Sequence, residues 1–159
     1  MKKIIIFGSD GMLGNYIKRY FICKSSLLVI PLNRYNYDIL KQDDQDLEKV
    51  LLENNINHET VVFNAIGVIP QASKNYELNN DLYTKVNKQF PIELSRLCNK
   101  YGAQLIHPTT DCVYSGKTGN YFEDSIHDAS DIYGSSKSLG EPSDCTVIRT
   151  SIIGEEKYN

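Results

Sequence analysis

The first fourteen residues of the chain place the strongest constraint on its fold. The apolar run Ile4-Ile5-Ile6-Phe7 ends at Gly8, and Gly11 and Gly14 follow. Apolar residues then recur at helical spacing over residues 12–22. A strand, a glycine turn and an amphipathic helix in this order predict the start of a βαβ unit, in which the strands pair in parallel and the connections are right-handed.

The rest of the chain continues this alternation of strands and helices. We expect further strands at residues 27–32, 60–66, 104–107 and 144–149, and a short one at 37–40. Helices are expected at residues 47–52, after an acidic stretch that matches a helix N-terminus, and at 78–101, where Pro91 must kink the helix or start a second one. The pattern predicts one α/β domain, a Rossmann-type doubly wound parallel sheet with helices on both faces.

Composition and charge limit the classes of function. A chain of 159 residues can bury one real core, and its formal net charge of −3 with scattered Lys and Arg argues against a nucleic-acid surface. The four cysteines have neither metal-ligand spacing nor the density of a disulfide scaffold, so we expect reduced thiols and no metal site. No apolar run reaches the roughly 20 residues of a membrane span, and Met1-Lys2-Lys3 leads straight into a strand. These features predict a cytoplasmic protein without a membrane segment.

The glycine turn is suited to binding a dinucleotide. Its glycines allow a tight turn, a close approach of the backbone to a pyrophosphate, and close packing of helix on strand. We therefore assign the turn and the start of the helix to a cofactor, with the residues Gly8, Asp10, Gly11, Met12, Leu13 and Gly14.

The end of the second strand bears on the choice of cofactor. The acidic residue that usually binds the adenosine ribose is absent, and Asn33-Arg34 stands there instead. An arginine can pair with a 2′-phosphate, which favours NADPH over NADH, whereas the alternative is that Arg34 is an ordinary solvated charge. Further along the chain, Ala65, Ile66 and Gly67 would let a cofactor ribose approach the sheet, and Asp38 and Ile39 would border the adenine.

A second motif connects Thr110 with Tyr133 and Lys137. The Tyr and the Lys are four residues apart, so they would lie on one face of a helix. We expect the Lys137 ammonium to lower the pKa of Tyr133 and to hold the nicotinamide ribose. Tyr133 would then protonate a carbonyl oxygen that receives a hydride at carbon, and Thr110 would hydrogen-bond the same oxygen. Strand alternation predicts that only one of Thr109 and Thr110 points inward.

The loop at residues 115–131 is long and polar, and such loops beside an α/β sheet are commonly functional. Asp111 and Glu123 are candidates for contact with a substrate, although a pair of carboxylates on a loop is weak support for glycosidase chemistry. The chain has no Gly-x-Ser-x-Gly motif, so nothing indicates nucleophilic catalysis.

Together these motifs resemble the extended short-chain dehydrogenase/reductase family, and within it the dTDP-4-dehydrorhamnose reductase branch. The resemblance extends over almost the whole chain and rests on residues 8–14, 64–67, 109–116, 120–124, 133–141 and 147–151, with Asn87 and Pro91. It implies a catalytic trio of Thr110, Tyr133 and Lys137. It also implies a cofactor-side role for Asn87 and substrate contacts at Thr109, Asp111 and Val113.

The reaction that the resemblance implies is the NAD(P)H-dependent reduction of a 4-keto-6-deoxy nucleotide sugar, the final step in making rhamnose-type donors. Some relatives also epimerise C3 before reduction. Family members continue into a small domain that holds the sugar nucleotide, so we expect residues 1–159 to be the NAD(P)-binding domain without that part, either as a fragment or as a naturally short protein. A homodimer is compatible with the resemblance.

Two alternatives to a reductase stay open at this point. One is a non-catalytic dinucleotide-binding protein similar to the regulatory subunit of methionine adenosyltransferase, which would not need Tyr133 and Lys137 together. The other is a nucleotide-sugar epimerase or dehydratase with the same cofactor and fold. A dehydratase usually needs an acidic pair beside the Thr, whereas Cys112 follows Asp111 here.

Overall fold

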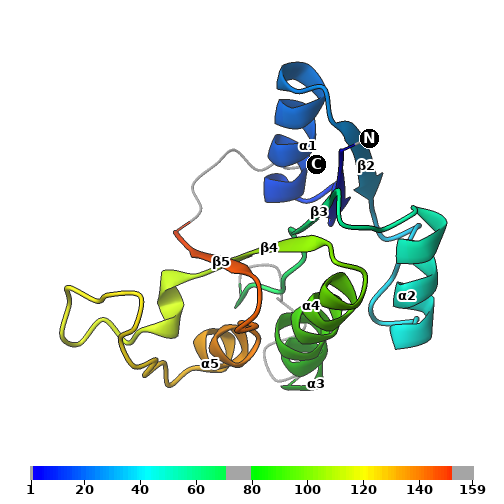
Figure 1. Ribbon diagram of the computed structural model, residues 1–159. Helices are drawn as coiled ribbons and strands as arrows, with labels where there is room; N and C mark the ends of the chain where they lie inside the picture. The colour runs from blue at the N-terminus through cyan, green and yellow to red at the C-terminus, as the bar shows by residue number, and fades with distance from the viewer. Residues whose placement is uncertain (1, 71–79, 152–159) are drawn as a thin grey trace.

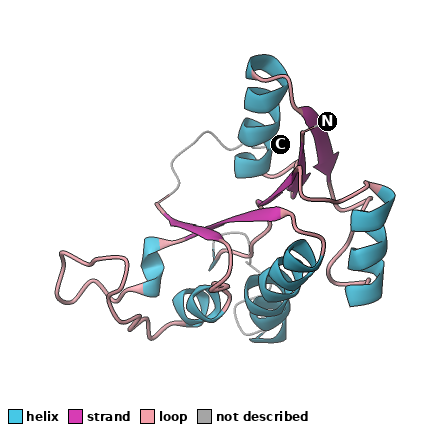
Figure 2. Cartoon of the chain, viewed as in Figure 1, coloured by secondary structure: helices cyan, strands magenta, loops and turns pink. Residues whose placement is uncertain are grey.

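The computed structural model describes residues 2–70 and 80–151, which contain a five-stranded parallel sheet with helices on both faces (Figure 1). Figure 2 shows the same view coloured by secondary structure. The strands are β1 (Lys3–Phe7), β2 (Leu28–Leu32), β3 (Thr60–Asn64), β4 (Gln104–Thr109) and β5 (Thr146–Arg149), in the spatial order β2-β1-β3-β4-β5. The helical elements are α1 (Met12–Lys24), α2 (Asp44–Glu53), α3 (Asn80–Tyr83), the π-helical η2 (Thr84–Gln89), α4 (Phe90–Lys100), the 3₁₀-helical η3 (Asp111–Val113) and α5 (Ile132–Leu139). The Rossmann-type fold class predicted from the sequence is confirmed.

The central strand β1 is buried on both faces of the sheet. Ile5 and Phe7 point to one face and Ile4 and Ile6 to the other, and none of the four is more than 1% exposed. The first face packs against α2, η2 and α4, and the second against apolar side chains of α1. In Figure 1, α1 accordingly lies apart from α3, α4 and α5. Burial on both faces explains why the strand sequence is continuously apolar.

The strand order reverses direction beside β1. The chain passes from β1 to its neighbour β2, and then crosses to the other side of β1 to form β3. In open α/β sheets ligands bind beyond the carboxyl ends of the strands at such a switch point. The segments that follow β1, β2 and β3 therefore converge on one side of the sheet.

The predicted strand at residues 37–40 is wrong, because this segment forms turns. The carbonyl of Asn33 accepts hydrogen bonds from the backbone N–H groups of Asn36 and Tyr37, at 3.0 and 3.1 Å, and the Asp38 side chain accepts one from Leu40 N at 3.0 Å. Tyr37 and Ile39 are nevertheless buried in the core. Their burial comes from a turn packed against the sheet and not from a strand.

The long helical region is divided into several elements. The expected start at residue 78 lies outside the described residues, and from Asn80 onward the region comprises α3, η2 and α4. Pro91 lies in the first turn of α4, where its missing N–H costs little. The helix expected at residues 47–52 is confirmed as α2, and Asp43 and Asp46 form a reciprocal capping box at its start.

The other predicted strands are confirmed with small shifts in their ends, which leave residues 27, 65–66 and 144–145 outside the sheet and extend β4 to Thr109. In the described part of the chain no helix has the length and apolar character of a bilayer span, and no group of His, Cys, Asp and Glu side chains could hold a metal ion.

Candidate active site and dinucleotide cleft

The glycine turn after β1 has the geometry of a phosphate-binding turn. Gly8 has a φ of 76°, a value that residues other than glycine rarely adopt. Gly11 N donates a hydrogen bond to Gly8 O at 3.0 Å. A Cβ on Gly14 would lie 2.1 Å from Gly8 O, so α1 packs directly on the turn. α1 starts at Met12 without a side-chain cap, so its first N–H groups are available to an anion.

A cleft of about 320 Å³ opens beside this turn, and we call it the dinucleotide cleft after the ligand predicted from the sequence. Its walls include many of the residues predicted to bind a cofactor: Gly8, Asp10, Gly11, Asn33, Arg34, Asp38, Ile39, Ala65, Ile66 and Gly67. Met12, Leu13 and Gly14 lie in the first turn of α1 and do not line it. The sequence analysis missed the apolar contributors Tyr37, Leu40, Val68, Leu82 and Val86. These side chains lie on elements that only the tertiary fold brings together.

Thr110 and Tyr133 are brought into contact by two local caps. The Thr110 hydroxyl caps η3 by accepting from Cys112 N at 3.1 Å, and donates to the Asp111 carboxylate at 3.3 Å. Asp131 caps α5 by accepting from Gly134 N at 2.8 Å, which places Tyr133 in the first turn of the helix. Tyr133 thus lies close to Thr110, whose side chain acts on the pKa of the phenol.

Burial, and not Lys137, dominates the pKa of Tyr133. The pKa of the phenol is raised because burial disfavours the phenolate, and the hydrogen bond with Thr110 lowers it by less. The pKa of Tyr133 is therefore raised by burial, and not lowered as the sequence analysis expected. Without a bound cofactor, Tyr133 holds its proton at neutral pH.

Lys137 is a buried cation of the site. The residue is only 6% exposed, and burial lowers the pKa of its ammonium to about 8. A Cβ on Gly67 would lie 2.6 Å from Lys137 Nζ, so the absence of a side chain at Gly67 gives the ammonium its place at the edge of the dinucleotide cleft. One side chain thus connects α5 with the segment after β3.

Asn87 lies behind the cleft wall. It is 1% exposed, and its amide pairs with the backbone of Val68, accepting from N at 2.9 Å and donating to O at 3.0 Å. Its Nδ2 also donates to Ser136 Oγ at 3.2 Å. Asn87 belongs to the π-helical element, a feature often found at functional sites. Its contacts tie the segment after β3 to α5, and it does not line the cleft.

Thr109 and Val113, two of the three predicted substrate contacts, are buried. Thr109 points with His107 toward the core, and neither Thr109 Oγ1 nor His107 Nε2 has a hydrogen-bond partner among the described residues. Val113 is fully buried. Thr109 and Thr110 are both buried, so the expected alternation fails because Thr110 lies beyond the end of β4, where it begins η3.

A second cleft, of about 530 Å³, opens at the carboxyl ends of β4 and β5. Its lining includes the predicted contacts Asp111 and Glu123, and also Cys112, Tyr114, Ser115, Gly116, Tyr121, Phe122 and Arg149. We call it the aromatic cleft, because the rings of Tyr114 and Tyr121 stack with centroids 4.5 Å apart. The pKa of Asp111 is lowered by hydrogen bonds, chiefly from Ser151. The sequence analysis missed these aromatic side chains as a group, although three of them, Tyr114, Tyr121 and Phe122, occur within ten residues of loop.

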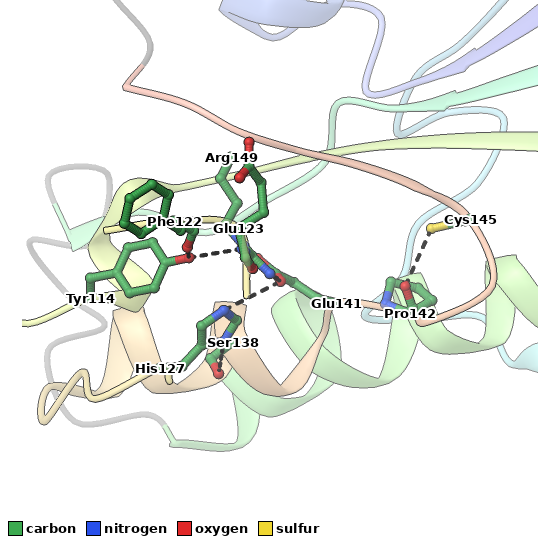
Figure 3. A network of polar contacts seen from close by, with 9 residues as sticks. All are labelled: Tyr114, Phe122, Glu123, His127, Ser138, Glu141, Pro142, Cys145 and Arg149. Atoms are coloured by element: carbon green, nitrogen blue, oxygen red, sulfur yellow. Dashed lines mark hydrogen bonds and ion pairs between the residues drawn. The ribbon is translucent and has the colours of Figure 1, made fainter. Parts of the chain in front are cut away.

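Arg149 connects the residues of the aromatic cleft with Glu141, which follows α5, and Figure 3 shows these contacts. Its guanidinium donates to both oxygens of Glu141 at 2.8–3.1 Å, to Tyr114 Oη at 2.8 Å and to the carbonyl of Glu123 at 2.6 Å. On the other side of Glu141, His127 Nε2 lies 3.8 Å from the carboxylate. The loop wall and the helix that carries Tyr133 and Lys137 are therefore held by one charged network.

Comparison with known proteins identifies the family of the chain. The model of the RmlD substrate binding domain family matches residues 1–158. The chain belongs to this family. Spore coat polysaccharide biosynthesis protein SpsK of Bacillus subtilis is similar, with 30% identity over 96% of the chain and 54% of SpsK. dTDP-4-dehydrorhamnose reductase of Mycobacterium tuberculosis is 26% identical over 96% of the chain and 50% of the reductase.

Solved structures of dTDP-4-dehydrorhamnose reductases share the fold. A dTDP-4-dehydrorhamnose reductase from Clostridium acetobutylicum superimposes with a TM-score of 0.80 at 27% identity, over 94% of the chain and 53% of the reductase. The Bacillus anthracis reductase, solved in complex with NADP, gives a TM-score of 0.79 at 22% identity, which shows a common fold. The chain spans about half the length of these relatives.

Proposed function

We propose that this protein carries the cofactor-binding and proton-donating part of an NAD(P)H-dependent reductase that acts on a 4-keto-6-deoxy nucleotide sugar. The observation that carries the proposal is the position of Tyr133 beside Thr110, with Lys137 four residues further along α5 and against Gly67. Asp111, next to Thr110, lines the aromatic cleft, and Gly67 lines the dinucleotide cleft. The trio thus lies between a space for a substrate and a space for a cofactor.

The dinucleotide cleft fits a nicotinamide cofactor. A side chain on Gly8 would meet Ile66 and the Ala65 backbone at 2.9–3.1 Å, so the glycine lets the turn pack directly against the segment after β3, which forms the opposite wall of the cleft. The uncapped start of α1 is available for the pyrophosphate. When bound, the nicotinamide supplies the hydride for reduction of the carbonyl carbon.

Tyr133 would donate its proton to the carbonyl oxygen. The raised pKa of the phenol keeps that proton in place until an acceptor arrives. Thr110 would turn its hydroxyl from Asp111, 3.3 Å away, to the same oxygen. Lys137 would hold the ribose hydroxyls and stabilise the phenolate that forms when the proton leaves.

The test of the proposal is turnover of NADPH with a dTDP-4-keto-6-deoxy sugar by the whole protein. We expect Tyr133→Phe to lower the rate by about 10²- to 10⁴-fold while NADPH still binds, as followed by the fluorescence of the reduced nicotinamide. Unchanged turnover in Tyr133→Phe would contradict the proposed acid. Tight binding of NADPH without any turnover would favour a non-catalytic binding protein.

Within this proposal NADPH is the expected cofactor, because Arg34 lines the cleft and has no ion-pair partner in residues 2–70 and 80–151. Arg34→Ala should weaken NADPH more than NADH, by about 1.5–3 kcal/mol. Equal loss for the two cofactors would mean that Arg34 is only a surface charge.

A further inference from the structure

The dinucleotide cleft contains a carboxylate beside the position where the usual acidic residue is missing. Asp10 belongs to the glycine turn, and Asn33 follows β2. The Nδ2 amide of Asn33 donates a hydrogen bond to Asp10 Oδ2 at 2.9 Å. Both residues line the cleft together with Arg34. The fold therefore brings an acid from the first turn to the end of β2, where the ribose of an adenosine would be bound.

The contact between Asn33 and Asp10 is held in place by the turn after β2. Asn33 Oδ1 accepts from Tyr35 N at 3.0 Å, which leaves the Nδ2 group to face Asp10. The backbone N–H of Asn33 donates to Asn36 Oδ1 at 2.9 Å, and its carbonyl closes the turn through Asn36 and Tyr37. Because both polar atoms of the Asn33 amide are hydrogen-bonded, its Nδ2 group is held in a fixed position facing Asp10.

Charges of both signs meet at this end of the cleft. The Asp10 side chain is 61% exposed, and one cation is near it, Lys18, whose Nζ lies 3.5 Å from Oδ1. Arg34 is exposed and has no ion-pair partner among the described residues. A 2′-phosphate bound here would be attracted by Arg34 and repelled by Asp10, and Lys18 would offset only part of the repulsion.

We propose that Asp10 is a specificity-determining residue that favours an unmodified adenosine ribose and opposes a 2′-phosphate. A carboxylate only accepts hydrogen bonds, so it suits ribose hydroxyls, which donate, and it disfavours phosphate oxygens, which also only accept. The selectivity between NADH and NADPH then depends on the balance between Asp10 and Arg34. This inference rests on the proposed function, because it takes the cleft to be a dinucleotide site.

The experiment measures binding of 5′-ADP and 2′,5′-ADP to the full chain by isothermal titration calorimetry at low ionic strength. In Asp10→Asn we expect the ratio of the two affinities to shift toward 2′,5′-ADP by about tenfold. Asn retains the size of the side chain and can still pair with Asn33 through its oxygen. Lys18→Gln removes the compensating cation, so the ratio should shift about threefold in the opposite direction. The shifts should shrink as salt is added.

Asp124→Asn is the matched control. Asp124 is an exposed carboxylate of the loop and lines neither cleft. Its neutralisation should leave the ratio unchanged. An equal shift in Asp124→Asn, or no shift in Asp10→Asn, would overturn the role of Asp10. Failure of the wild-type chain to bind either nucleotide would instead overturn the proposed function, and the inference with it.

Discussion

The two clefts near Thr110, Tyr133 and Lys137 are built in different ways. The dinucleotide cleft is formed mainly by segments that directly follow β1, β2 and β3, so its walls are held by the sheet. The aromatic cleft is formed by η3, by a loop without regular secondary structure and by the end of β5. The loop is held to the body of the protein by side-chain contacts of Arg149. We therefore expect the dinucleotide cleft to tolerate few changes to its backbone, and the aromatic cleft to depend on a few polar side chains.

A glycine substitution in each region should show this difference most strongly. In Gly14→Ala the new Cβ would lie 2.1 Å from Gly8 O and 2.8 Å from Gly8 C, and backbone cannot move aside cheaply. We expect a loss of at least about 3 kcal/mol of unfolding free energy, measured by urea denaturation. Gly116→Ala in the loop has a φ of 78° but nothing within 4 Å of its Cβ, so it should cost about 1 kcal/mol. Equal costs would mean that the turn after β1 is not rigidly packed.

The next largest effect concerns the charge of Lys137. Burial lowers its pKa from 10.5 to about 8, so below pH 8 the folded protein carries a buried ammonium that the unfolded chain keeps in water. Lys137→Met should therefore be about 2 kcal/mol more stable than the wild type at pH 7. Between pH 8 and 10.5 the unfolded wild type binds more protons than the folded one, so its stability rises and the difference shrinks.

The control for Lys137 is an exposed lysine of the loop. Lys117→Met should change stability by less than about 0.5 kcal/mol at any pH in this window. A difference between Lys137→Met and wild type that does not vary with pH would show that the gain comes from packing and not from removal of the charge. Under the proposed function, Lys137→Met should also fail to reduce a carbonyl substrate, because the buried ammonium that costs stability would hold the ribose and stabilise the Tyr133 phenolate.

The contrast between the clefts also explains how much the sequence could predict. The glycine spacing and the apolar strands follow local rules, so the fold and most of the dinucleotide cleft could be predicted. The distance along the chain between Tyr114 and Arg149 is 35 residues, and no local pattern pairs them. The same limit applies to the pKa of Tyr133, since spacing placed a cation near it but could not reveal how deeply the ring is buried. The strand predicted at residues 37–40 is wrong for the same reason, because Tyr37 and Ile39 are buried by a turn and the local sequence does not distinguish this from burial in a strand.

Loss of the Arg149 network should have an intermediate effect, confined to the aromatic cleft. Arg149→Met leaves Glu141, a mostly buried carboxylate, without its bidentate partner, and should cost about 1.5 kcal/mol. Hydrogen exchange should speed up at Ala129, whose N–H donates to Val113 O, and stay unchanged at Gly11 in the glycine turn. The exposed Arg96–Glu93 pair is the control, and Arg96→Met should cost less than about 0.5 kcal/mol. Faster exchange at Gly11 in Arg149→Met would show that the two clefts are not independent.

The smallest expected effect on stability is at Gly67, and it separates stability from function. A Cβ there would lie 2.6 Å from Lys137 Nζ, the end of a flexible side chain that can move, so Gly67→Ala should cost less than about 0.5 kcal/mol. The displaced ammonium should still weaken NADPH about fivefold, as measured by fluorescence titration. Gly119→Ala, which has a φ of 68° in the loop, should cost more stability, about 1 kcal/mol, and leave NADPH binding unchanged. If Gly119→Ala loses more stability while Gly67→Ala loses more NADPH affinity, the position of the Lys137 ammonium serves ligand binding. If Gly67→Ala loses stability and affinity together, Gly67 has a structural role alone.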